Sequence, residues 1–334
     1  MSKKNLFMRT PEVSTYTSYG CLFSIMDDRL WPWIYNNFIQ ITYAHTWGIF
    51  AFENHVRLLS NCPGISYYEI PRIVVDYKWD KKIKNLIIEA LEMDYYVYIY
   101  VDRYYIKQSS SYQKYCSPHE VLICGYDLSK RTFTIADNLE NGKFIVTECT
   151  FDEVEKGYWA IKSKYDFMTN IRYLKQNKEY TCHINLPQII LNIDNYLLSK
   201  KNYDLIQDQE FDYGFDAYHR LFADILNAEK SFELDWRGFH LLYEHKILME
   251  MRIKYLLDIE VISCSSNFLE AITKLKNDFL VLRNLVIKYN LTLDRNILER
   301  IKGNLEDSLN RERSYLFDLL NDLKQNLEKE HSVL

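Results

Sequence analysis

The chain has 334 residues, of which 48% are hydrophobic and 26% are charged, and its formal net charge is −5. This composition excludes a disordered or collagenous chain and is typical of a globular protein with about two domains. The acidic balance argues against a dedicated nucleic-acid-binding protein, which would carry a basic stripe. The sequence contains neither G-x-G-x-x-G nor G-x-x-x-x-G-K-[ST], so it has no nucleotide-phosphate fingerprint.

In the first 165 residues, helical patterns come before strand patterns. Residues 21–44 predict a helix broken at Pro32, because proline cannot donate a hydrogen bond to the preceding turn. Residues 80–93 carry an apolar stripe at helical spacing and predict an amphipathic helix with Asp80 near its start.

Four strands are then expected, because β-branched and aromatic residues dominate four short runs separated by turn residues. One of these turns, Asn141-Gly142, is a hairpin signal. The expected strands are residues 95–101, 120–126, 132–136 and 143–149. Helices followed by an antiparallel meander predict an α+β domain.

The remainder of the chain reads as helix almost throughout, with apolar residues three and four apart. The expected helices are residues 215–228, 236–257, 269–286 and 296–328. Their stripes are most simply the core of an antiparallel bundle, and the last helix could pack internally or against a second copy in a homodimer. Because composition shifts once, near residues 165–190, we expect one domain over residues 1–170 and an all-α domain over residues 190–334.

The cysteine pattern and the hydropathy predict a cytoplasmic protein. The chain has no run of about 18 apolar residues and no signal-like segment, so we expect no membrane helix. The cysteines are odd in number, irregularly spaced and without C-x-x-C, which favours reduced thiols and no metal site. They are Cys21, Cys62, Cys116, Cys124, Cys149, Cys182 and Cys264.

Three residues together predict a nucleophilic site. Cys21 follows Gly20 and opens a predicted helix, where the helix dipole favours the thiolate and nearby amides could receive an oxyanion. His119 begins one predicted strand and Asp137 ends the next, so the two side chains should meet at one end of the sheet. The carboxylate could then hold the imidazole, as in a papain-like order of Cys, His and Asp.

Each of these residues also has a plainer interpretation. A single cysteine among seven is more often a small buried hydrophobic residue, and a lone histidine is more often hydrogen-bonded or on the surface. Asp137 with Asn138 after a strand is usually a turn. The three in order, on these elements, favour a catalytic interpretation.

The sequence also resembles a known family, the proteins related to the N-terminal domain of butirosin biosynthesis protein H. These are papain-like proteins found beside nonribosomal peptide synthetases. The resemblance spans roughly residues 14–257, and its sharpest part is the run from His119 to Asp127 followed by Ala136-Asp137. Further matching segments are residues 95–102, 104–105, 133–138, 213–218, 236–246 and 251–256.

The resemblance implies a cysteine acyltransferase that forms an amide. An acyl group would move from a phosphopantetheine thioester on an acyl or peptidyl carrier protein, through acyl-Cys21, to a small amine. His119 would be the general base and then the acid, and Asp137 its orienter. Papain-like peptidases place an oxyanion-donating Gln six residues before the nucleophile, where this chain has Thr15. Thr15, Gly20 and Asn138 are therefore the expected supporting residues.

Two alternatives remain open on the same residues. The first is a cysteine peptidase or amidase using the same triad. The second is a non-catalytic scaffold that recruits a carrier protein through the helical domain. In each case we expect no intrinsic cofactor, no metal, no nucleic acid and no membrane partner.

Overall fold

The structure, a computed structural model, describes residues 2–79, 82–163, 165–203, 210–228, 233–263 and 267–332, so Asp80 and Cys264 lie outside the described residues. The chain forms two compact units. Unit 1 comprises Met1–Arg29 and Arg57–Thr181, and unit 2 comprises Leu30–Val56 and Cys182–Leu334. The chain therefore passes between the units three times, and the last passage, after Thr181, lies within the expected boundary region of residues 170–190. The earlier two passages place residues 30–56 in unit 2, which the sequence did not indicate.

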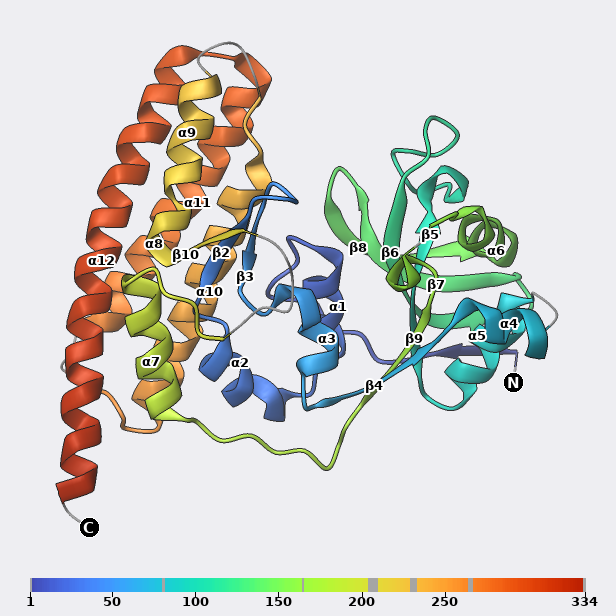
Figure 1. The fold of residues 1–334 in the computed structure, drawn as a ribbon, viewed down its shortest axis with the longest axis horizontal. Helices are drawn as coiled ribbons and strands as arrows, with labels where there is room; N and C mark the ends of the chain where they lie inside the picture. The colour runs from blue at the N-terminus through green and yellow to red at the C-terminus, as the bar shows by residue number, and fades with distance from the viewer. Residues whose placement is uncertain are drawn as a thin grey trace. The chain divides into compact units, whose positions relative to one another are not determined.

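Unit 1 is built on an antiparallel sheet (Figure 1). Over the described residues its strand order is β4 (Ile65–Ile70), β9 (Ile171–Gln176), β5 (Tyr96–Asp102), β6 (Pro118–Asp127), β7 (Thr132–Glu140) and β8 (Lys143–Thr150), with β1 (Lys3–Asn5) paired to β6. The meander predicted from the sequence is confirmed as β5 to β8. The strands β1, β4 and β9, which the sequence did not reveal, extend it.

Helices α5 (Ile83–Glu92) and α6 (Phe151–Ala160) share one core cluster with the inward residues of β5, β6 and β7. The predicted stripe of α5 is fully buried there. The start of α6 is fixed by a capping box, in which the Thr150 hydroxyl accepts from the Glu153 amide and the Glu153 carboxylate accepts from the Thr150 amide. Two short helices, α3 (Leu58–Asn61) and α4 (Arg72–Lys78), flank β4 along the chain.

The helix predicted over residues 21–44 is wrong in its bounds. The chain instead forms α1 (Thr17–Ile25) in unit 1, and α2 (Trp31–Asn37) and the strand β2 (Ile41–Ala44) in unit 2. Pro32 lies in the first turn of α2, where no backbone donor is needed, so it starts a helix rather than breaking one. The run Ile41–Ala44 pairs with β3 (Ile49–Phe52) and with β10 (Phe211–Tyr213).

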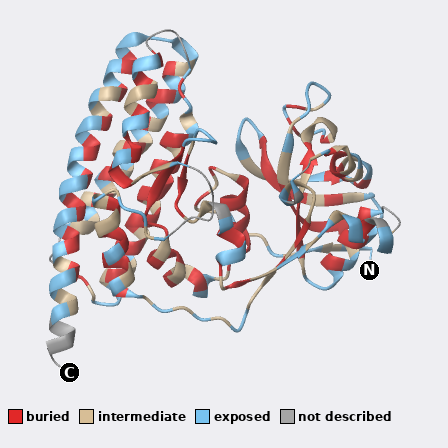
Figure 2. Ribbon diagram, in the orientation of Figure 1, coloured by how far each residue is buried: buried red, intermediate tan, exposed pale blue. Residues whose placement is uncertain are grey.

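Unit 2 is mostly helical, as the sequence predicts. Its helices are α2, α7 (Leu186–Leu197), α8 (Gly214–Ala217), α9 (His219–Ala228), α10 (Trp236–Asp258), α11 (Phe268–Thr292) and α12 (Arg295–Ser332). Helix α11 packs against both α10 and α12, and α12 also contacts α7. Figure 2 shows buried and exposed residues alternating along α12, as the leucine spacing requires.

The core of unit 2 contains one fully buried ion pair. Lys246 of α10 and Glu312 of α12 are 2.6 Å apart, with side chains 0% and 2% exposed. The hydroxyl of Tyr196, on α7, donates to Glu312 at 3.1 Å. These polar groups join three helices at one point. No helix in the described ranges is long and apolar enough to cross a membrane.

Candidate functional site

The sheet of unit 1 brings His119 and Asp137 together. His119 is the second residue of β6, and Asp137 lies near the end of the antiparallel neighbour β7. The Nδ1 atom of His119 is 3.1 Å from Oδ1 of Asp137. The sequence argument that placed both side chains at one end of the sheet therefore agrees with the geometry of this pair.

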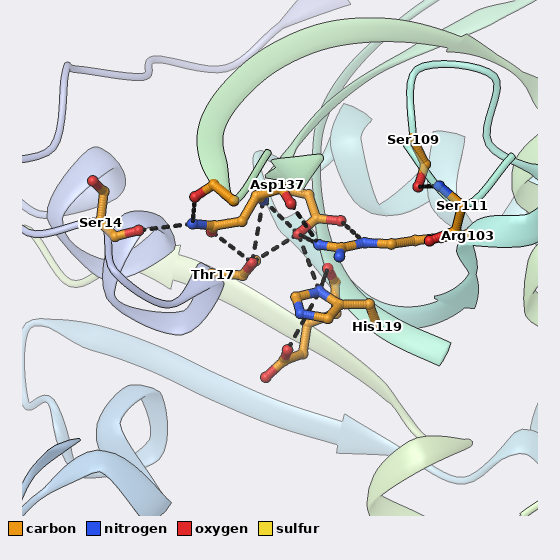
Figure 3. A network of polar contacts seen from close by, with 10 residues as sticks. Ser14, Thr17, Arg103, Ser109, Ser111, His119 and Asp137 are labelled. Atoms are coloured by element: carbon orange, nitrogen blue, oxygen red, sulfur yellow. Dashed lines mark hydrogen bonds and ion pairs between the residues drawn. The ribbon is translucent and has the colours of Figure 1, made fainter. Parts of the chain in front are cut away.

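Asp137 is fully buried and has several hydrogen-bond donors around its carboxylate (Figure 3). Arg103, in the turn that follows β5, donates from Nε to Oδ2 at 2.9 Å and from Nη2 to Oδ1 at 2.6 Å. Thr17, the first residue of α1, donates its hydroxyl to Oδ1 at 2.7 Å. Buried carboxylates need such partners to remain ionised, so this arrangement is fit to hold a charged Asp137.

The two partners shift each other's pKa in opposite directions. Burial alone would lower the pKa of His119, but the hydrogen bond to Asp137 and the charge of that carboxylate raise it above its ordinary value. Burial alone would raise the pKa of Asp137, but His119 and Arg103 lower it overall. Each partner therefore favours the charged form of the other.

The other imidazole nitrogen is available for proton transfer. The His119 side chain is 32% exposed, and within the described ranges its Nε2 makes no hydrogen bond. A histidine held at Nδ1 by a carboxylate keeps the tautomer that leaves Nε2 free to accept a proton. The dyad of His119 and Asp137 can therefore act as a general base and acid.

Cys21 does not complete this dyad in the structure. It lies in the second turn of α1, and its residue is fully buried. Burial, followed by the charges of Asp137 and Glu120, raises the pKa of the thiol well above its ordinary value. Among the described residues no hydrogen bond joins its sulfur to His119. The expectation that the helix dipole favours a thiolate is wrong, because α1 begins at Thr17, four residues earlier.

Gly20 has a packing role in place of the expected open amide. Its N–H donates to the carbonyl of Tyr16 at 3.0 Å, so it is not free for an oxyanion. A Cβ at this position would lie 2.4 to 2.8 Å from three ring atoms of Phe144, on β8. Glycine therefore lets the Phe144 ring pack directly on the helix backbone.

The other two expected supporting residues are buried beside α1. Thr15 lies two residues before the helix and is 5% exposed. Asn138 is 8% exposed and donates its side-chain amide to the carbonyls of Ser14 and Gly142, and its side-chain oxygen lies 2.8 Å from the Thr17 hydroxyl oxygen. Asn138 thus ties the segment entering α1 to the hairpin between β7 and β8.

The sequence reasoning missed Arg103 and Thr17. The strand register could have revealed Arg103, because Val101 pairs with His119 and Asp102 with Pro118, which places the next residue at the same end of the sheet. Thr17 could be found only by knowing where α1 begins. Within the described part of the chain, no group of three or more His, Cys, Asp or Glu residues is placed to hold a metal ion.

Comparison of the sequence with known proteins gives no relative whose function could be compared with this site. No protein-family model matches this sequence, and no curated protein matches it.

Proposed function

We propose that this chain is a cysteine-dependent acyltransferase and that unit 1 is a papain-like domain of the kind found in the family related to butirosin biosynthesis protein H. The acyl donor is a phosphopantetheine thioester on a carrier protein, and the product is an amide of a small amine. The single observation that supports this most strongly is the 3.1 Å contact between His119 and the buried carboxylate of Asp137. Such a dyad is the proton-transfer half of a nucleophilic site.

In the proposed reaction, Nε2 of His119 takes the proton of the Cys21 thiol. The thiolate attacks the thioester carbonyl, the bond from carbon to the pantetheine sulfur breaks, and that sulfur takes the proton back from His119. An amine then attacks acyl-Cys21 and gives its proton to Nε2, which returns it to the leaving sulfur. Thioester and acyl-cysteine are close in free energy, so positioning and exclusion of water are the main requirements.

This chemistry requires Cys21 to become accessible. The thiol is buried one helical turn beyond Thr17, the α1 residue that contacts Asp137. Residues four apart lie on the same face of a helix, so Cys21 follows Thr17 along the stripe that faces the dyad. The proposed reaction therefore requires a movement of α1 that brings the Cys21 sulfur to Nε2 of His119.

The test is intact-mass detection of an acyl adduct after mixing the full chain with an acyl-pantetheine thioester. The exposed Cys116 and the half-buried Cys182 are first replaced by Ala, so that neither of these accessible thiols can take up the acyl group. We expect an adduct that Cys21→Ala abolishes without unfolding the protein and that His119→Gln slows by about 10²- to 10⁴-fold. Added amines should yield amide in excess of free acid. Free acid as the only product would instead identify a peptidase or amidase.

The burial of Cys21 favours a second candidate, a non-catalytic scaffold that recruits a carrier protein. A thiol that is sealed and protonated is unreactive, and the dyad would then serve only to join α1 to the sheet. Under this hypothesis the chain binds the carrier protein, forms no adduct, and binds equally well as Cys21→Ala. An adduct that maps to Cys21 rules the scaffold out as the sole function.

A further inference from the structure

Arg103 is placed to control both the position and the charge of the dyad. It is the first residue of the 3₁₀ turn Arg103–Tyr105, which follows β5 directly. Its guanidinium contacts both oxygens of Asp137 and also donates to the carbonyl of Asn138 at 3.0 Å. A planar guanidinium bonded to both carboxylate oxygens fixes the plane of the carboxylate, which a single donor does not.

The orientation of this carboxylate decides how His119 is held. Oδ1 of Asp137 receives Nδ1 of His119, the Thr17 hydroxyl at 2.7 Å and the Asn138 amide at 2.6 Å. Oδ2 receives only Arg103 among the described residues. Without Arg103, Oδ2 would lose its donor, and the carboxylate would be held through Oδ1 alone, with its plane less firmly fixed toward His119.

Arg103 also acts on His119 through charge. Its side chain is 13% exposed, so its field is only partly screened. The Asp137 and Glu120 carboxylates raise the pKa of His119, whereas the Arg103 guanidinium opposes them. A histidine that must accept a proton near neutral pH needs this opposing positive charge, since an imidazole that is always protonated cannot act as a base.

We propose that Arg103 is a positioning residue for His119, holding Asp137 so that Nδ1 keeps its proton and Nε2 remains the free base. The effect of Arg103 on catalysis rests on the proposed function. Its effect on the tautomer and the pKa of His119 does not, because both can be measured without substrate.

The test is NMR titration of the histidines in the full-length chain, with the His119 signal assigned by its absence in His119→Gln. Three variants are compared with wild type. Arg103→Gln removes the charge, and Arg103→Lys keeps the charge but lacks the planar pair of N–H donors. Arg131→Gln is the matched control. Arg131 lies in the same unit and is exposed, 3.9 Å from the exposed Asp152. Circular dichroism verifies that each variant is folded.

We expect Arg103→Gln to raise the pKa of His119 and Arg131→Gln to leave it unchanged. In Arg103→Lys the ¹⁵N shifts of the neutral ring should move from the Nδ1–H tautomer toward a mixture of the two tautomers. This second variant keeps the test decisive if Arg103→Gln fails to fold. An unchanged or lower pKa in Arg103→Gln, or an unchanged tautomer in Arg103→Lys, overturns the proposal.

Activity then separates this inference from the proposed function. If Cys21 forms the adduct, Arg103→Lys should slow its formation by about 10²-fold, the loss typical of a misplaced catalytic group. If no adduct forms in wild type, the acyltransferase proposal fails, while the NMR outcome still decides the role of Arg103.

Discussion

Replacing Gly20 by alanine separates a packing role for this residue from a catalytic one. The new Cβ would lie 2.4 to 2.8 Å from ring atoms of Phe144, so the ring or the helix must move. Overpacking of this kind costs about 1–3 kcal/mol. Alanine in place of glycine within a helix contributes about 1 kcal/mol in the opposite direction. We therefore expect Gly20→Ala to lower the free energy of unfolding by up to about 2 kcal/mol.

Phe144→Ala provides the matched background for this prediction, because it removes the ring that the new Cβ would meet. In that background Gly20→Ala should raise the free energy of unfolding by about 0.5–1 kcal/mol, through helix propensity alone. Urea unfolding of the four proteins gives the coupling between the two positions directly. A change of the same sign in both backgrounds would refute the packing argument.

Three further predictions concern polar groups that the structure places in contact. Because the pKa of His119 is raised in the folded state, its pairing with Asp137 stabilises the protein fully below about pH 6.5, and this stabilisation is lost as the pH rises through the folded-state pKa. The difference in free energy of unfolding between wild type and His119→Gln, measured in urea, should therefore shrink from about pH 6 to about pH 9. A constant difference would contradict this. Lys246→Met should lower the free energy of unfolding by about 3–5 kcal/mol, because it leaves the Glu312 carboxylate buried without a counter-charge, and adding Glu312→Leu should restore much of that stability. Additive losses in the double variant would contradict a stabilising ion pair. Thr17→Val should lower the free energy of unfolding by about 1–3 kcal/mol, because it removes the hydroxyl that is hydrogen-bonded to the buried Asp137 carboxylate, whereas Thr17→Ser should be as stable as wild type. Equal stability of the Val and Ser variants would show that this hydrogen bond contributes nothing.

The parts of the fold that depend on local sequence could be predicted. The strands β5 to β8 are neighbours in the chain, so their aromatic runs and turns define them without knowledge of the rest. The long helices of unit 2 carry their own apolar period. The strand β2 was missed although its partner β3 is close in sequence, because a short apolar run is equally compatible with helix; its other partner, β10, lies about 170 residues later.

The candidate site divides in the same way. The pairing of His119 with Asp137 follows from two adjacent strands, and the sequence predicted it. The surroundings of Cys21 depend on where α1 begins and on what packs over it, and no local pattern encodes either. Placing the helix start at Cys21 instead of Thr17 turned a buried thiol into an expected thiolate.

The measurement that tests the central claim most directly is peptide mapping of the chain, with Cys116 and Cys182 replaced by Ala, after incubation with acyl-pantetheine thioester. The account predicts one acyl group on the peptide that contains Cys21, removed again when an amine is added. No acylation of that peptide, or the same total acylation in Cys21→Ala, would contradict it.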